Sequence, residues 1–398
     1  MTKIGIGLST LSDPSKAAKA ALNQALQTAD ATPETIQKSL IMLFLSENYD
    51  YCQVLNQIKS VITTDNIIGS TSAGVFCNRI SSMSGIVIGI FKSDELSFSL
   101  AAEEGISVDE TKAGFNLGSK LIDKIHEVKD TNYITILLLA DGVTNSISLL
   151  VNSLFNKLGS NVRYAGGGAG DNLRFLKTLQ FHRDKALNDS VVSALIASKK
   201  PIGIGTSHGW LPISPPLVVT NSDFNQVREL DWRNAFEVYS NIVRAYGKTE
   251  INENNCKEIL MSFPLGIPQS SEEYYIIRDP VLKKPDGTMI FVGDVPNNSV
   301  VRVMYGDKES LMSSPIIATL EALKQLGGCK PAGVLVFYCI SRCLLLQDAF
   351  HEEIAAINDL VGKDVPVFGC MTYGEIGSLY AGPPAFHNKS LVVCIFPE

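Results

Sequence analysis

The chain repeats one structural plan three times along its length. In each repeat an apolar stretch is followed by a polar loop, a helix, a second apolar stretch that ends in a Gly-rich turn, and a further apolar stretch. The second stretch with its turn covers residues 67–74, 162–170 and 367–377. Near-continuous apolar strands joined by helices are typical of strands buried on both faces. The sequence therefore predicts an α/β (mixed α+β) protein with pseudo-repeated strand–helix–strand modules.

Two explanations fit this repetition: duplication of one unit, or the ordinary alternation of an α/β fold. The chain has 398 residues, more than one compact core usually holds, so we expect two domains. Residues 201–216 are rich in Gly, Pro and Ser, and beyond them short strands alternate with turns, with Asp286-Gly287 as a hairpin signal. We place the boundary near Asp223, which gives domains 1–222 and 223–398.

Net charge, apolar runs and cysteine spacing indicate which partners and which cellular compartment to expect. The formal net charge is -7, and an acidic surface repels phosphate, so neither nucleic acid nor an anionic membrane is expected as a partner. The longest apolar runs are too short to span a bilayer, and no export signal precedes the first strand. We therefore expect a cytoplasmic location. The eight cysteines include no C-x-x-C pair, which favours reduced thiols over disulfides or a structural zinc site.

The three Gly-rich turns are the place where we expect a ligand. Open α/β sheets bind ligands at the carboxyl ends of their strands, and glycine lets backbone N–H groups approach a ligand closely. The alternative is that these glycines only make tight turns between strand and helix. The predicted ligand contacts in the first two turns are Ser70, Thr71, Ser72, Gly167, Gly168 and Asp171.

Three further side chains are predicted as polar anchors near the third turn: Arg342, Tyr373 and Glu375. Arg342 follows a buried strand and could fork onto a ligand carboxylate. Glu375, flanked by glycines, could accept a hydrogen bond from a ligand ammonium group, so the pair would suit a zwitterion. The alternative for Arg342 is a salt bridge to Glu375 or Asp348.

A cysteine nucleophile is the competing enzymatic hypothesis. Cys339 and Cys370 lie at the same strand ends, and His387 or His351 could act as the base. No G-x-S-x-G motif and no His–Asp pair at motif spacing supports a hydrolase, and a buried, inert thiol is the alternative. A structural adaptor that recruits a partner through its surface is a third possibility.

Seven segments carry a resemblance to FIST proteins, which pair an N-terminal with a C-terminal FIST domain. They are Gly69–Gly74, Tyr164–Asp171, Gly205–Pro212, Phe263–Gly266, Ile277–Pro280, Cys339–Arg342 and Phe368–Gly377. The resemblance covers nearly the whole chain. One position departs from the pattern, because Ser341 stands where the family often has glycine before the motif arginine.

The resemblance implies a non-enzymatic sensory protein that binds a small, amino-acid-like ligand. Because the chain carries no kinase, cyclase or receptor segment, we expect it to regulate a separate partner such as a histidine kinase or cyclase. A bacterial branch of the family is similar to haem-containing nitric-oxide sensors of two-component signalling. That branch implies haem b as an alternative cofactor.

The haem alternative would need an axial histidine and cationic partners for the propionates. His208, in a Gly-rich turn, is the first candidate for the axial ligand, and His182 is the second. The alternative for His208 is that its ring nitrogens hydrogen-bond to carbonyl groups of the loop. No C-x-x-C-H motif for covalent attachment occurs. The proposed propionate partners are Arg163, Arg174 and Arg183.

Overall fold

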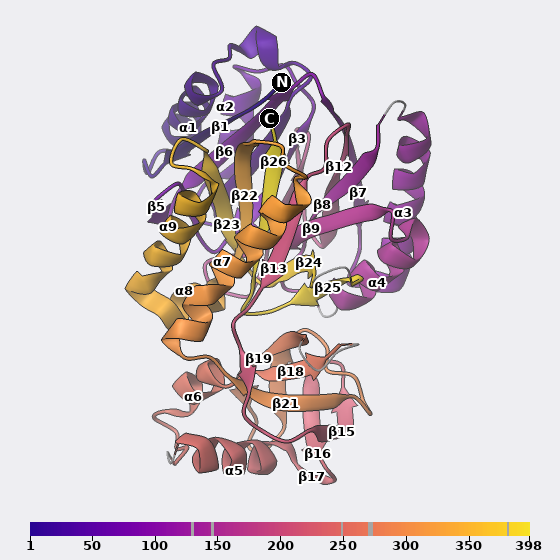
Figure 1. Cartoon of the computed structure of the whole chain (residues 1–398), viewed down its shortest axis with the longest axis vertical. Helices are drawn as coiled ribbons and strands as arrows, with labels where there is room; N and C mark the ends of the chain where they lie inside the picture. Colours follow the sequence, from indigo (N-terminus) through magenta and orange to yellow (C-terminus); the bar gives the residue numbers. More distant parts are fainter. Residues whose placement is uncertain (129–130, 145–146, 248–249, 270–273, 380–381) are drawn as a thin grey trace.

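A computed structural model describes residues 1–128, 131–144, 147–247, 250–269, 274–379 and 382–398. The chain forms a body of three α/β modules, with an eight-stranded sheet inserted into the third of them (Figure 1). In Figure 1 the inserted sheet lies at the lower end of the molecule, and the N- and C-termini lie close together at the upper end of the body. The mixed fold class expected from the sequence is confirmed.

The first module begins at the N-terminus. Its elements are β1 (Thr2–Ser9), α1 (Pro14–Thr28), η1 (Pro33–Ile36), β2 (Leu40–Ser46), α2 (Tyr51–Lys59), β3 (Ile67–Ser72), the hairpin of β4 (Val75–Cys77) and β5 (Ile80–Ser82), and β6 (Ile86–Ser93). All seven residues of β2 are buried, as the continuous apolar run predicts. The expected helix over residues 51–62 ends three residues early, with Ser60 as its C-cap.

The second module repeats this succession. Its elements are β7 (Leu96–Glu104), α3 (Glu110–Glu127), β8 (Tyr133–Ala140), α4 (Ile147–Leu158), β9 (Val162–Gly168), the hairpin of β10 (Gln180–His182) and β11 (Lys185–Leu187), and β12 (Ser190–Ser198).

The third module is interrupted after its first strand. Its elements are β13 (Gly203–Ser207), then, beyond the insertion, α7 (Lys308–Gln325), β22 (Pro331–Cys339), α8 (Ile340–Leu346), η2 (Gln347–Ala349), α9 (Phe350–Val361), β23 (Val367–Thr372), the hairpin of β24 (Glu375–Ser378) and β25 (Pro384–His387), and β26 (Leu391–Pro397). The module that begins before residue 223 is therefore completed after it.

The three modules share one strand order and exchange their hairpins. The orders are β1-β6-β2-β3, β7-β12-β8-β9 and β13-β26-β22-β23, and in each the last two strands are parallel. The hairpin of the first module pairs through β4 with β23 of the third module. The hairpin of the second module pairs through β10 with β3 of the first, and the hairpin of the third pairs through β24 with β9 of the second. The exchange closes a ring, so each sheet depends on residues from a neighbouring module.

One hydrophobic core fills the space between the three sheets, and helices cover their outer faces. Phe44, Leu137 and Phe337, one from each sheet, belong to this shared core. The outer faces are covered by α1 and α2, by α3 and α4, and by α7 and α9. Glycine permits the closest of these contacts: a Cβ at Gly203 would lie 1.9 Å from the carbonyl oxygen of Ala322 in α7.

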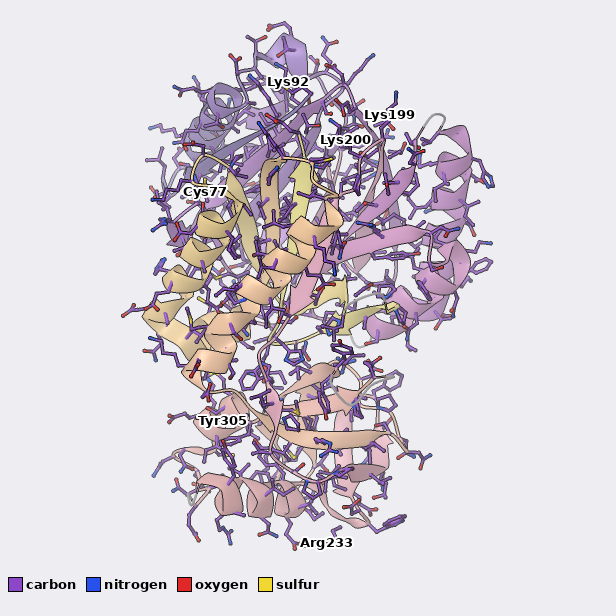
Figure 2. The ribbon with its side chains drawn as sticks, in the orientation of Figure 1. Cys77, Lys92, Lys199, Lys200, Arg233 and Tyr305 are labelled. Atoms are coloured by element: carbon purple, nitrogen blue, oxygen red, sulfur yellow. The ribbon has the colours of Figure 1, made fainter. Side chains whose placement is uncertain are left out.

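The inserted segment forms a sheet with its own core. Its elements are β14 (Leu211–Pro212), β15 (Leu217–Asp223), β16 (Gln226–Leu230), β17 (Arg233–Asn234), α5 (Ala235–Gly247), α6 (Cys256–Ser262), β18 (Leu265–Pro268), β19 (Tyr275–Lys283), β20 (Met289–Val292) and β21 (Val300–Tyr305). The expected hairpin at Asp286-Gly287 connects β19 to β20. The expected domain boundary falls at the end of β15. Figure 2 shows Arg233 at the far end of this sheet.

The helix expected over residues 231–246 begins later, at Ala235. Asp231 and Trp232 adopt left-handed backbone conformations with φ of 49° and 57°, which a right-handed helix excludes. Within the described residues, no helix combines the length and apolar character needed to cross a bilayer.

Candidate functional site

The three Gly-rich turns meet at one place in the body, where β3, β9 and β23 end. Their backbones are joined by hydrogen bonds: the N–H of Ala73 donates to Met371 O (3.0 Å), and that of Tyr373 donates to Gly168 O (2.9 Å). A Cβ at Gly170 would lie 2.7 Å from the nitrogen of Ala73. The turns thus converge on one place, and the backbone groups named here bind each other. Glycine serves here to let three chain segments approach closely.

The predicted contacts in the first turn are buried. The Thr71 hydroxyl accepts a hydrogen bond from the Leu179 N–H at 3.0 Å, and the Ser72 hydroxyl lies 3.5 Å from Leu45 O. Ser70 is 1% exposed and pairs with Gln180 of the exchanged hairpin. Gly167 and Gly168 belong to β9, and Gly167 pairs with Glu375 of β24.

Asp171 and Tyr373 form one buried unit. The Tyr373 hydroxyl donates to Asp171 at 2.6 Å, and the same carboxylate accepts the backbone N–H groups of Phe175, Leu176 and Lys177. Although burial opposes ionisation, these hydrogen bonds hold the pKa of Asp171 below its ordinary value. The carboxylate therefore organises the loop that follows the second turn.

Glu375 lies in a polar environment formed by hydroxyl groups. Its carboxyl group accepts hydrogen bonds from the hydroxyls of Thr372 (2.6 Å) and Ser390 (2.7 Å). Complete burial raises the pKa of Glu375 to about 8, because the charged form loses its hydration. The carboxyl group is therefore mostly protonated at neutral pH.

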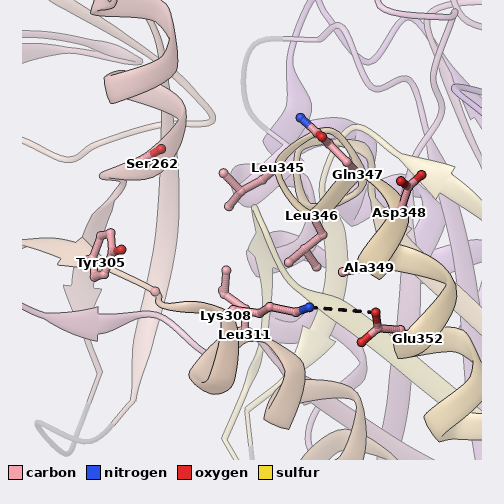
Figure 3. A pocket seen from close by; sticks show the side chains of 11 residues that line it. Ser262, Tyr305, Lys308, Leu311, Leu345, Leu346, Gln347, Asp348, Ala349 and Glu352 are labelled. Carbon is pink, nitrogen blue, oxygen red and sulfur yellow. Dashed lines mark ion pairs between the residues drawn. The ribbon is translucent and has the colours of Figure 1, made fainter.

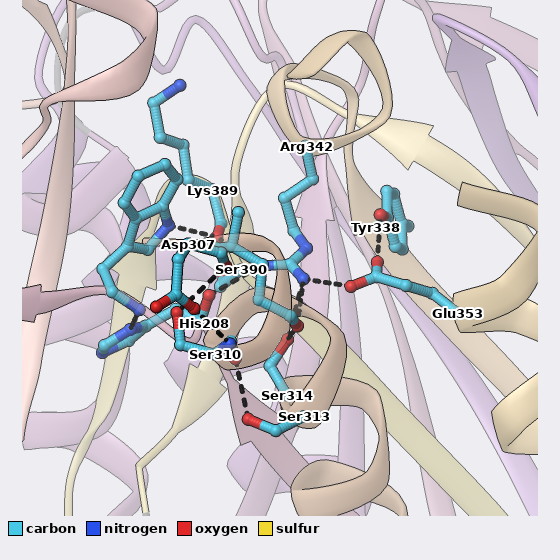
Figure 4. A network of polar contacts seen from close by, with 12 residues as sticks. His208, Asp307, Ser310, Ser313, Ser314, Tyr338, Arg342, Glu353, Lys389 and Ser390 are labelled. Carbon is cyan, nitrogen blue, oxygen red and sulfur yellow. Dashed lines mark hydrogen bonds and ion pairs between the residues drawn. The ribbon is translucent and has the colours of Figure 1, made fainter. Parts of the chain in front are cut away.

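Arg342 is fully buried at the centre of the network in Figure 4. Its guanidinium forms an ion pair with Glu353 of α9, which in turn accepts the Tyr338 hydroxyl. It also donates to the carbonyl oxygens of His208 (2.6 Å) and Leu311 (2.9 Å). Although burial opposes the charged form, Glu353 raises the pKa of Arg342 above its ordinary value. The partner is neither Glu375 nor Asp348, the two carboxylates considered from the sequence.

A second set of buried charges attaches the inserted sheet to the body. Arg278 of β19 donates to Phe386 O (2.8 Å) and to the Ser148 hydroxyl (3.1 Å) of α4. The adjacent Asp279 lies 3.0 Å from Nζ of Lys389 and accepts the Ser341 hydroxyl at 2.6 Å. These contacts give a structural role to the Ile277–Pro280 motif, for which the sequence indicated no role.

Glu353 and Lys389 are residues that the sequence analysis missed. Glu353 sits on the buried side of an otherwise amphipathic helix, and a charge at an apolar position was the available signal. Lys389 precedes an apolar strand, and its left-handed φ of 52° is unusual for a side chain of this size.

The two histidines considered for haem differ in their hydrogen bonding. The His208 ring accepts the N–H of Trp210 at Nδ1 (2.9 Å) and has a further hydrogen bond with the backbone of Tyr275. An axial bond to iron would have to replace one of these, so His208 does not fit that role. Among the described residues, the buried Nε2 of His182 finds no hydrogen-bond partner, but His182 lines neither cavity described below.

The cysteines considered as nucleophiles are both buried. The Sγ of Cys339 accepts the backbone N–H of Lys389 at 3.1 Å, and burial raises the pKa of both Cys339 and Cys370 far above the ordinary value. Nε2 of His387 contacts Gly377 O (3.1 Å). Because the thiolate is the reactive form, this environment works against nucleophilic chemistry.

A cavity of about 460 Å³ lies beside the Arg342 network, between the inserted sheet and the third module (Figure 3). Ser262 and Tyr305 line it from the inserted segment. The opposite wall comes from the N-terminal turns of α7 and from residues 345–352. Figure 2 shows the position of Tyr305 in the whole molecule.

The lining of this cavity combines leucines with charges of both signs. Leu311, Leu345 and Leu346 form its apolar part. Lys308 and Glu352 lie on its rim with 3.9 Å between Nζ and Oε1, and Asp348 lies nearby. The volume lies in the range of small-molecule sites, which are usually apolar with a few placed polar groups.

Comparison with known protein families identifies the family of this chain. The FIST N domain matches residues 39–233, and the FIST C domain matches residues 235–378. The chain belongs to the FIST family. FIST domains are associated with signal transduction and the sensing of small ligands.

Individual similarities are distant. An uncharacterized protein of Methanocaldococcus jannaschii is 21% identical over 354 residues, which cover 85% of this chain and 67% of that protein. A solved cyanuric acid hydrolase from A. caulinodans covers 50% of this chain and 71% of its own, with 10% identity and a TM-score of 0.27. A second cyanuric acid hydrolase structure covers all of both chains, with 10% identity and a TM-score of 0.34.

Proposed function

We propose that this protein is a small-ligand sensor whose ligand binds in the cavity between the inserted sheet and the third module, and that it reports binding to a separate signalling protein. The observation that supports the proposal is that the cavity walls come from two different parts of the chain. Ser262 and Tyr305 belong to the inserted segment, whereas Lys308 and Leu345–Ala349 belong to the module that surrounds it. A ligand that touches both walls would favour one relative position of the two parts.

The ligand we propose is amino-acid-like. Lys308 would meet a carboxylate, while Asp348 and Glu352 would meet an ammonium group. The leucines at 311, 345 and 346 would bury an aliphatic side chain. A zwitterion with an apolar side chain matches all three parts of this lining. The partner would be a histidine kinase or a cyclase.

Arg342 has a supporting role in this proposal. It lies on α8, three residues before Leu345, and it holds the carbonyl oxygen of Leu311 at 2.9 Å. It would thereby fix two walls of the cavity without touching the ligand. Direct ligand contacts at the three Gly-rich turns stay a prediction.

Thermal-shift measurements with L-leucine and two analogues test this function. 4-Methylvalerate lacks the amino group and isoamylamine lacks the carboxylate, so only the zwitterion should stabilise the protein. Lys308→Gln and Glu352→Gln should each reduce the shift, with little effect on stability because an exposed ion pair contributes at most about 1 kcal/mol. The exposed Lys330→Gln serves as the control. Equal shifts with all three compounds would refute zwitterion recognition.

A further inference from the structure

A second cavity, distinct from the proposed sensor site, lies between α7 and β9. It is an open groove of about 910 Å³. Its walls are largely apolar and include Val162, Tyr164, Ile204, Ile317 and Leu320. Ile317 and Leu320, which line this groove from α7, are 44% and 51% exposed. An apolar molecule seated here would remove both side chains from water.

Comparison of the first and third modules singles out one residue of this groove. In the first, α1 caps the edge strand β1: the N–H of Leu8 donates to Oε1 of Gln24 at 3.1 Å. In the third, α7 caps β13 in the same way, and Glu321 accepts the backbone N–H of Thr206. A neutral amide is therefore sufficient to accept the hydrogen bond from the N–H group at the strand edge. The carboxyl group at position 321 adds a titratable group to the groove.

Arg163 of β9 adds a cation whose guanidinium lies over the Tyr133 ring, 5.9 Å from the ring centroid. The half-buried guanidinium donates through Nη1 to Ile202 O (2.6 Å) and to Oε1 of Gln325 (3.1 Å). No ion pair with a carboxylate is found for Arg163 in the described parts of the chain. Burial lowers its pKa, which indicates that its charge is incompletely solvated. An anion would supply the missing partner, since a guanidinium binds a carboxylate through several N–H groups.

We propose that this groove binds an organic carboxylate with an apolar body, such as a medium-chain fatty acid. Arg163 pairs with the carboxylate, the walls formed by Ile317 and Leu320 cover the hydrocarbon chain, and Lys324 adds a second positive charge at the rim. Glu321 determines the pH range in which the anion is accepted. This site is independent of the sensor cavity, so either proposal can fail alone.

The pH dependence follows from the groups that line the groove. Burial raises the pKa of Glu321 to about 7, against the opposing effects of the Thr206 N–H and Lys324. The other charged groups that line the groove are Arg163 and Lys324, while burial raises the pKa of Tyr164 so that its phenol stays neutral. Below about pH 7 the Glu321 carboxyl group is protonated, and above it the carboxylate repels a bound anion. Affinity should therefore fall as the pH rises through neutrality.

Isothermal titration calorimetry with decanoate, decylammonium and decanol tests the charge preference, because the three compounds share one hydrocarbon chain. Decanoate should bind with one site per chain and more tightly than the other two. Arg163→Gln should weaken decanoate binding at least about tenfold, whereas Arg163→Lys, which keeps the charge but not the forked donors, should weaken it less. Thermal unfolding of each variant confirms that the fold is intact.

Glu321→Gln tests the pH dependence of decanoate affinity in a protein that should keep its fold. Gln24 shows that an amide can make the same strand contact, so this variant should remain folded. For the unaltered protein, decanoate affinity should fall severalfold between about pH 6 and about pH 8, and Glu321→Gln should remove that fall. No binding, equal binding of decanoate and decanol, or unchanged affinity in a folded Arg163→Gln variant would overturn the site. A pH dependence that persists in Glu321→Gln would overturn the role of Glu321.

Discussion

Nζ of Lys389 lies 3.0 Å from the carboxylate of Asp279, and both side chains are shielded from solvent. The two residues come from different parts of the chain, because Asp279 belongs to the inserted sheet and Lys389 to the third module. Their pairing attaches one part to the other. Removing one partner of a buried ion pair leaves an uncompensated charge and costs roughly 3–5 kcal/mol.

Lys389→Met should therefore lower the free energy of unfolding by about 3–5 kcal/mol. Urea denaturation followed by fluorescence measures the loss, and the exposed Lys330→Met provides the matched control. The double variant Lys389→Met/Asp279→Leu should recover much of the stability, because neither charge is then left buried alone. If Lys389→Met unfolded at the same urea concentration as the control, the pair would have no such role.

Arg342→Ala should act on stability in a similar way. The guanidinium is fully buried against Glu353, so its removal should cost roughly 3–5 kcal/mol. Glu353→Gln tests the same pair from the other side, since it keeps a similar shape without the charge. A ligand-contact role would produce the opposite pattern: lost affinity for L-leucine with unchanged unfolding midpoints.

Glu375 should make the protein less stable as the pH rises. Its pKa is about 8 in the folded protein, and it returns to an ordinary value near 4.5 on unfolding. A raised folded pKa stabilises the fold fully below about pH 4.5, and this contribution is lost progressively up to about pH 8. Denaturation midpoints measured across this window should fall more steeply for the unaltered protein than for Glu375→Gln, which stays neutral. Parallel slopes would contradict the assignment.

The pattern of apolar residues predicted the modules, because a fully apolar strand such as β2 must be buried on both faces, as β2 is. The hairpin exchange could not be predicted. β4 pairs with β23, which is almost 300 residues away in the sequence, and the two strands that could pair with it, one in its own module and one in the third, are both apolar. The partner of Arg342 was missed for the same reason: Glu353 becomes its neighbour only after α9 packs against α7 and the third sheet.

The cavity beside Arg342 was equally hidden, because Ser262, Tyr305 and Leu346 lie far apart in sequence and outside the motifs found there. Steric blocking tests whether this cavity is the sensor site. Leu346→Trp would place a larger side chain in it and should abolish the thermal shift caused by L-leucine. Leu344→Trp is the matched control, since Leu344 lies on the same helix, is 38% exposed and does not line the cavity. Equal ligand responses in the two tryptophan variants, with both proteins folded, would place the sensor site elsewhere.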